Sequence, residues 1–223
     1  GGEVFLLGKA PYRKDDGYWF FVNRTLLTRV KGIIRPRAMC EEYIDRLFGQ
    51  SGYSAIGFKF MLKQHLSRPY VLPMLHERGV KPILVRRWNC LKTLVSRRTA
   101  EQSGVFHVSS DLKVGTAVDA WTPKKIDLDT NRLISDLDAV NAVHARWRDF
   151  LGPSCNYLEV VYEDYCRNVI EENSRVLDYL GVKRARLYSD LTKVNPDQLS
   201  QIIGNYEDVR NILKNSKYSF CLD

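Results

Sequence analysis

The sequence lacks the patterns that mark a disulfide framework or a metal centre. Its five cysteines never form a C-x-x-C pair, and its four histidines stand at unrelated spacings. Disulfide scaffolds carry cysteines in even number, and zinc sites need closely spaced cysteines and histidines. We therefore predict no disulfide framework and no metal, and the scattered thiols are compatible with a reducing compartment such as the cytoplasm.

Other signatures are missing as well. No apolar run reaches the roughly 18 residues of a membrane span, and no signal peptide opens the sequence. The motifs G-x-S-x-G and H-E-x-x-H, Gly-rich nucleotide fingerprints, RNA-binding signatures and zinc fingers are not found. These absences set aside hydrolase, zinc-protease and dinucleotide-binding chemistry.

What the sequence does contain is typical of a globular enzyme. It has 223 residues, of which 44% are hydrophobic and 27% charged, so it can bury a full core. We find no linker or repeat and predict one domain over 1–223. The net charge of +8 indicates an anionic partner, which leaves phosphates, sulfates, nucleic acid and membrane surfaces open.

The order of the elements predicts an α/β fold. Apolar runs predict buried strands at 54–61, 82–85 and 157–161. Helical spacing predicts helices at 36–48, 69–79, 89–104, 129–150 and 168–180, with two short ones near 196–203 and 205–214. A β-α-β-α order implies right-handed crossovers and a parallel sheet.

The junction between strand 82–85 and the following helix is the strongest candidate site. Arg86, Arg87 and Asn89 lie there. Ser96 follows about two helical turns later and could add a hydroxyl group only if the helix begins late or bends. Backbone N–H groups at a helix start, with guanidinium groups beside them, bind anions. A basic solvated helix behind a core strand explains this stretch equally well.

Two further residues have a structural and a functional interpretation. Lys59 lies in the predicted strand 54–61. A lysine in such a strand is usually an edge residue with its charge in solvent. In the functional interpretation, its cation lies at the strand end and contacts an anion. His107 lies in the segment 105–122, which we predict to be a functional loop, although a lone histidine is more often a surface residue.

Several segments, taken in order, resemble the sulfotransferases that use 3′-phosphoadenosine 5′-phosphosulfate (PAPS). The branch they resemble most contains carbohydrate sulfotransferases, including the trehalose and Nod-factor enzymes. The matching segments are 2–5 (G-E-V-F), 56–64 (I-G-F-K-F-M-L-K-Q), 85–96 (V-R-R-W-N-C-L to S), 104–107 (G-V-F-H), 161–164 with 180–182 (V-Y-E-D, L-G-V) and 203–213.

The resemblance implies a three-layer α/β/α fold with a central parallel sheet and a topology similar to P-loop NTPases. It also implies transfer of a sulfuryl group from PAPS to a hydroxyl group of a carbohydrate or glycolipid, with 3′-phosphoadenosine 5′-phosphate (PAP) as product and no metal. Glu3 would be the base, and Lys59 would lie near the transferred sulfonate. Arg86, Arg87, Asn89 and Ser96 would bind the donor's 3′-phosphate end, and His107 would lie on the acceptor side.

The sequence departs from the family at two points. Trp88 stands eight residues before Ser96, where many sulfotransferases have their arginine, so Arg87 lies one residue further away. The family's phosphosulfate loop should precede Glu3, and we therefore expect the natural chain to continue on the N-terminal side. Two alternatives stay open: an inactive member that binds an anionic ligand or partner, and a basic nucleic-acid-binding domain, which no motif supports. A homodimer is also open.

Overall fold

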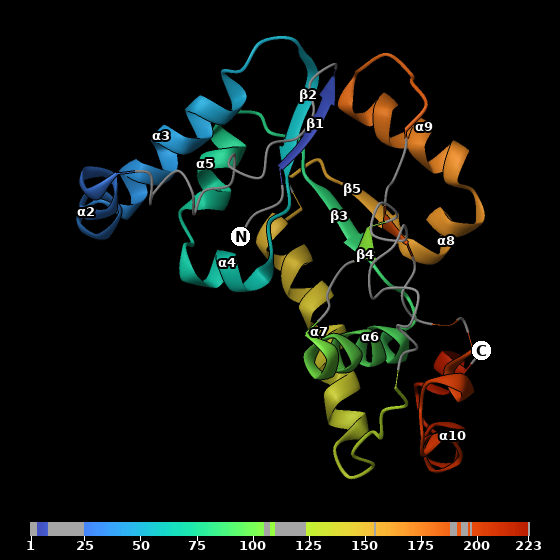
Figure 1. Ribbon diagram of the computed structural model, residues 1–223. Coiled ribbons are helices and arrows are strands. Elements are labelled where there is room, and N and C mark those ends of the chain that lie inside the picture. Colours follow the sequence, from blue (N-terminus) through green and yellow to red (C-terminus); the bar gives the residue numbers. More distant parts are fainter. Residues whose placement is uncertain are drawn as a thin grey trace, which may run out of the picture. The chain divides into compact units, whose positions relative to one another are not determined.

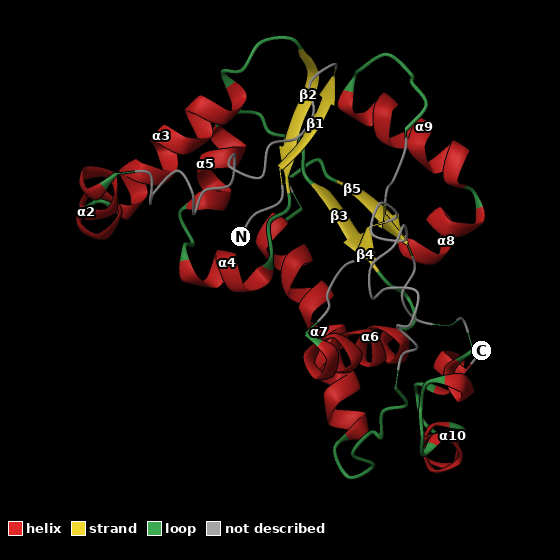
Figure 2. Ribbon diagram, viewed as in Figure 1, coloured by secondary structure: helices red, strands yellow, loops and turns green. Residues whose placement is uncertain are grey.

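The computed structural model of the protein describes residues 4–8, 25–104, 108–109, 124–153, 155–187, 191–192, 196 and 198–222. These residues form helices and short strands (Figure 1, Figure 2), so the predicted α/β class is confirmed. The chain divides into two compact units. Unit 1 holds the described residues of Gly1–Leu84, Leu151–Leu158 and Ile170–Ala185, and unit 2 holds those of Val85–Phe150, Glu159–Val169 and Arg186–Asp223.

Unit 1 has its core between two helices. Its elements are β1 (Val4–Gly8), α2 (Leu26–Ile34), α3 (Pro36–Phe48), β2 (Tyr53–Phe58), α4 (Leu62–Ser67), α5 (Val71–Glu77) and most of α9 (Val169–Leu180). The buried core side chains come from α3 and α5, namely Cys40, Tyr43, Ile44, Leu47, Val71, Met74 and Leu75. β1 and β2 are antiparallel, with Val4 opposite Phe58.

Local signals fix the bounds of α3. Pro36 occupies the first turn, where the missing N–H of proline removes no helical hydrogen bond. Tyr43, Ile44 and Leu47 recur at helical spacing and are buried against the core of unit 1. The prediction of a helix over 36–48 is confirmed.

Unit 2 contains the predicted junction. The chain enters it within β3 (Ile83–Arg86) and again within β5 (Leu158–Val161), which pair in a small parallel sheet. Its other elements are α6 (Cys90–Ser103), β4 (Val108–Ser109), α7 (Leu133–Leu151), α8 (Tyr162–Arg167), β6 (Leu191–Thr192), the 3₁₀ helices η3 (Leu199–Gln201) and η4 (Ser219–Leu222), and α10 (Tyr206–Leu213).

The core of unit 2 is formed mainly by α6, α7 and the C-terminal segment. Leu91, Leu137, Ile202, Val209 and Leu213 are each fully buried in it. α6 starts at an Asn89 cap and ends at Gly104, whose φ of 70° lies in the left-handed region that favours glycine. Both ends of this helix agree with the prediction from sequence.

Several features differ from the expectation. The strand predicted over 54–61 ends at Phe58, and the pairs β1–β2 and β4–β6 are antiparallel. The helices α2, α4 and α8 lie where no helix is predicted. The three-layer arrangement around one parallel sheet and the single domain over 1–223 stay predictions. None of the described helices is long and apolar enough to cross a membrane.

Candidate functional site at the junction of β3 and α6

Asn89 fixes the start of α6. Its Oδ1 accepts a hydrogen bond from the Lys92 N–H at 2.9 Å, and its Nδ2 donates one to the Cys221 carbonyl at 2.8 Å. The residue is only 6% exposed. Asparagine is among the preferred N-caps, because its side chain satisfies a backbone donor of the first turn. Asn89 therefore holds both the helix start and the C-terminal segment in place.

A carboxylate occupies the helix start. Glu163, in the first turn of α8, accepts the backbone N–H of Trp88 at 2.8 Å and that of Asn89 at 3.1 Å. Burial raises the pKa of Glu163, but these hydrogen bonds and the charge of Arg87 outweigh burial and lower it. The sequence predicts an anion site at this helix start, and the structure shows an anion of the chain itself there.

Arg87 lies next to this carboxylate. Its Nε is 3.6 Å from Glu163 Oε1, and its guanidinium carbon lies 4.8 Å from the centre of the Tyr162 ring. Nη1 donates a long hydrogen bond of 3.5 Å to the Lys92 carbonyl. Nε is buried, and no described residue accepts a hydrogen bond from it. Arg87 is thus held in position by a ring and a carboxylate while part of its donor capacity is unused.

Ser96 lies one turn of α6 beyond Lys92, the residue whose carbonyl Arg87 contacts. Lys92 and Ser96 share a face of α6. The Ser96 residue is exposed. That the Arg87 guanidinium group and the Ser96 hydroxyl group bind one ligand stays a prediction.

Arg86 has different surroundings from Arg87. Its Nε pairs with Glu159 of β5, and Arg148 of α7 donates to the same carboxylate at 2.8 Å. Its guanidinium carbon lies 4.8 Å from the centre of the Trp88 ring. The hydrogen bond from Arg148 is the largest cause of the lowered pKa of Glu159, and Arg86 contributes as well. One carboxylate between two guanidinium groups leaves a net positive charge here.

Both arginines line a cavity of about 270 Å³ in unit 2. The other lining residues are Trp88, Cys90, Asn141, His144, Lys217, Tyr218 and Phe220. His144 Nδ1 is buried without a hydrogen-bond partner among the described residues. Burial, then the charges of Arg86 and Arg148, lower the pKa of His144, which keeps its imidazole neutral near pH 7. The cavity combines cationic and aromatic side chains.

A family model described as Stf0 sulphotransferase matches residues 79–206, more than half of the chain. The chain belongs to the Stf0 sulphotransferase family. This confirms the family that the sequence motifs indicate, and it supports a sulfotransferase activity. The matched segment of this Stf0 sulphotransferase includes both arginines, Ser96 and Glu163. Neither a curated protein nor a solved structure matches the chain.

The remaining predicted site residues lie outside the junction. Lys59 directly follows β2 in unit 1 and is exposed, whereas Arg86 and Arg87 belong to unit 2. Glu3 and His107 lie outside the residues that the structure describes. In this Stf0 sulphotransferase, the structure therefore places Arg86 and Arg87 at one cavity, while the roles of all the predicted site residues stay predictions.

Sequence reasoning missed the acidic partners. Glu163 belongs to a recognised motif, Y-E-D, but nothing in the motif says that the glutamate accepts two amides at a helix start. The one available signal is position, because Glu163 follows β5 and the ends of parallel strands meet at one edge of a sheet. That signal places Glu163 at one edge of the sheet, but it does not say which groups Glu163 contacts there.

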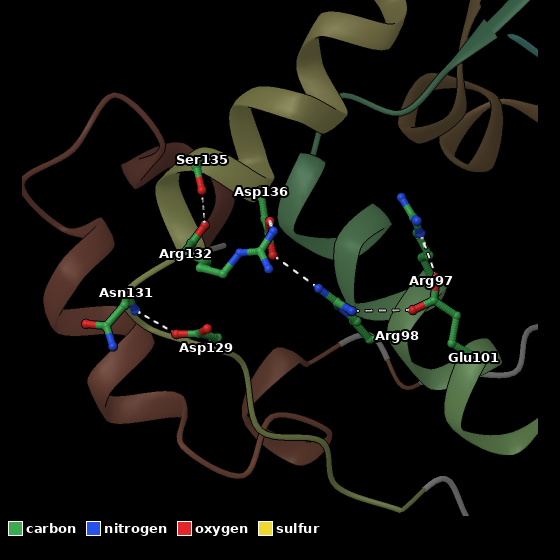
Figure 3. Close-up of polar contacts among 8 residues, drawn as sticks. All are labelled: Arg97, Arg98, Glu101, Asp129, Asn131, Arg132, Ser135 and Asp136. Carbon is green, nitrogen blue, oxygen red and sulfur yellow. Dashed lines mark hydrogen bonds and ion pairs between the residues drawn. The ribbon is translucent and has the colours of Figure 1, made fainter. Parts of the chain in front are cut away.

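A second polar cluster ties α6 to α7 (Figure 3). Arg98 pairs with Asp136 at 3.2 Å and with Glu101 at 3.5 Å, and Arg97 pairs with Glu101 at 2.8 Å. A cavity of about 320 Å³ beside it is lined by Arg98, three aspartates and apolar side chains of the unit 2 core. Exposed ion pairs contribute little to stability. We assign this cluster a role in packing the two helices.

Proposed function

We propose that this Stf0 sulphotransferase transfers a sulfuryl group from PAPS to a hydroxyl group of a carbohydrate or glycolipid. The observation that carries the proposal is the cavity lined by Arg86 and Arg87 before the start of α6, inside the family-matched segment that also contains Ser96. A guanidinium group and a hydroxyl group are well suited to hold a phosphate, because both donate hydrogen bonds to its oxygens. The free thiols at all five cysteines fit a cytoplasmic enzyme.

The donor's 3′-phosphate would bind through side chains. The amides of Trp88 and Asn89 already donate to Glu163, so they are not free for a phosphate. No described residue accepts a hydrogen bond from the buried Nε of Arg87, and in the proposal a phosphate oxygen would accept one. In this proposal Arg86 adds positive charge, Ser96 adds a hydroxyl, and Asn89 supports the site by capping α6.

The chemistry needs positioning and charge stabilisation. The bond between sulfur and the phosphate oxygen breaks, a bond between sulfur and the acceptor oxygen forms, and PAP leaves. In the proposal Glu3 takes the proton of the acceptor hydroxyl, Lys59 stabilises charge on the transferred group, and His107 contacts the acceptor. This division of roles follows the general logic of group transfer between phosphate-like centres.

Calorimetry with PAP tests the donor site. We expect Arg87→Ala to weaken PAP binding by about 1–3 kcal/mol, the scale of a lost charge-assisted hydrogen bond. Arg97→Ala is the matched control, because Arg97 lies on α6, the helix that follows Arg87, and its side chain is 71% exposed. Equal affinity of the Arg87 variant and the wild-type protein would remove Arg87 from the site, and no PAP binding by either protein would refute the proposed donor.

A second candidate function is an inactive family member that binds an anionic ligand. It is favoured by Glu159 and Glu163, which already partner the two arginines of the junction. Mass spectrometry of an acceptor sugar incubated with PAPS and the full-length protein separates the candidates. A sulfated product supports the enzyme, whereas PAP binding without product supports the inactive member.

A further inference from the structure

Helix α2 carries an exposed apolar stripe. Its large apolar residues Leu26, Leu27, Val30, Ile33 and Ile34 are 77%, 71%, 43%, 81% and 69% exposed. At 100° per residue these positions span an arc of about 120°, which is one face of a helix. The buried core of unit 1 comes from α3 and α5 and contains none of them. The stripe is therefore an apolar surface that the described part of the chain leaves in solvent.

Basic residues border this stripe. Position 31 lies next to one edge of the stripe on the helical wheel and holds Lys31. Arg24, Arg35 and Arg37 extend the positive charge along the chain, and residues 17–40 contain neither aspartate nor glutamate. A helix with an apolar face, basic edges and little negative charge is typical of proteins that lie on anionic membranes.

Two acidic residues of α3 face this segment. Lys31 lies 3.5 Å from Glu42, and both side chains are about half exposed. Arg37 pairs with Glu41 at 3.1 Å, also at the surface. Exposed pairs of this kind are worth little, so a lipid phosphate can replace the carboxylate as the partner of Lys31.

We propose that α2 docks this protein on a membrane surface that contains anionic lipids. Leu27, Ile33 and their neighbours in the stripe insert between the headgroups, and the basic border contacts lipid phosphates. The helix has nine residues, about 13.5 Å in length, so it lies in the plane of the membrane and does not span it.

The basic residues beside the stripe argue against a second copy of the chain as its binding partner. In a face-to-face pair the basic borders of two α2 helices would meet each other, and like charges at a contact repel. An anionic bilayer offers both an apolar interior and negative charge at the surface. This inference does not rest on the proposed sulfotransfer, because it follows from the surface of unit 1 alone.

Co-sedimentation with lipid vesicles tests the apolar part of the proposal. We expect the full chain to pellet with vesicles of phosphatidylcholine mixed with phosphatidylglycerol and to stay in solution with phosphatidylcholine alone. Ile33→Asn should reduce the partition coefficient at least about tenfold, because it removes one inserted isoleucine. Ile170→Asn is the matched control, since Ile170 is 85% exposed on α9 and does not belong to the stripe.

A second pair of variants tests the charge. Lys31→Gln should weaken vesicle binding about fivefold, the scale for one basic residue at an anionic surface. Arg97→Gln makes the same change of net charge on α6, where another exposed basic residue pairs with a carboxylate, and it should leave binding unchanged. Raising the salt concentration should release the wild-type protein, since screening weakens attraction between surface charges.

Three outcomes would overturn the proposal. They are equal binding to neutral and anionic vesicles, unchanged binding of the Ile33 variant, and no binding to the anionic vesicles. If a dimer that dissociates on Ile33→Asn is then seen in sedimentation velocity, the stripe belongs to a second copy. Circular dichroism confirms that each variant keeps its fold.

Discussion

Replacing Glu163 by glutamine removes the negative charge at the start of α6 and leaves the side chain's size almost unchanged. Glu163 accepts the amides of Trp88 and Asn89 and pairs with Arg87. Glutamine keeps one acceptor oxygen, so it satisfies one amide and leaves the other with an NH₂ group opposite. The side chain is only 24% exposed, which limits replacement of the lost partner by water.

The expected cost follows from these contacts. One charge-assisted hydrogen bond and one partly buried ion pair are lost, and together they correspond to about 2 kcal/mol of unfolding free energy. The pKa of Glu163 is lowered in the folded protein, so its contribution is present above the pKa of an unfolded glutamate, about 4.3. The contribution disappears as pH falls through the folded pKa, because the carboxylate is then protonated in both states.

Urea unfolding followed by circular dichroism measures this difference at neutral and at acidic pH. We expect a clear loss of stability in Glu163→Gln at pH 7 that shrinks steadily below pH 4.3 or so. Glu101→Gln is the matched control, because Glu101 is an exposed carboxylate of α6 that also pairs with arginines, and its replacement should cost much less. A loss that does not depend on pH, or an equal loss in both variants, would show that Glu163 does not act through its charge.

Three further predictions concern the site. In the full-length protein, Glu3→Gln should abolish turnover in a sulfation assay while PAP binding measured by calorimetry stays intact, because the base acts on the acceptor. Unchanged turnover would remove Glu3 from that role. Asn89→Ala should lower the unfolding free energy by about 2 kcal/mol, because the oxygen and the nitrogen of the Asn89 side-chain amide each make a hydrogen bond. In the same urea titration, Asn131→Ala at an exposed position should lower the unfolding free energy far less. Lys59→Ala should reduce turnover more than PAP affinity, and equal losses in both would place Lys59 at the bound nucleotide.

The sequence predicts those elements that end at local signals. α3 begins at Pro36, α6 lies between the Asn89 cap and Gly104, and α9 stops before Gly181, where φ is 76°. A proline, a capping side chain and a glycine each act on the backbone within a few residues. These bounds therefore need no knowledge of the rest of the fold.

Other elements depend on partners that the local sequence does not contain. The antiparallel pairing of β1 with β2 joins segments about fifty residues apart, and no turn between them fixes the register. α2 was missed for another reason. It has only nine residues, and its apolar stripe becomes a clear period only when both bounds are known.

The candidate site was predictable in position but not in its charges. Arg86 and Arg87 are recognisable at the end of a strand, because arginines beside a helix start form a known type of anion site. Their carboxylate partners come from β5 and α8, more than seventy residues later. Adjacent residues of an extended segment point to opposite sides, so the two arginines meet different carboxylates.

These carboxylates explain how two neighbouring arginines can be held rigidly before any ligand arrives. Without partners, Arg86, Arg87 and Arg148 would repel one another and would lose side-chain entropy on being ordered. Glu159 lies between Arg86 and Arg148, and Glu163 lies beside Arg87, so each guanidinium group is oriented by an opposite charge. Three guanidinium groups facing two carboxylates leave a net positive charge, which favours an anion. A dianionic phosphate can then bind to groups that are already in place, and the entropy of ordering them is not lost again on binding.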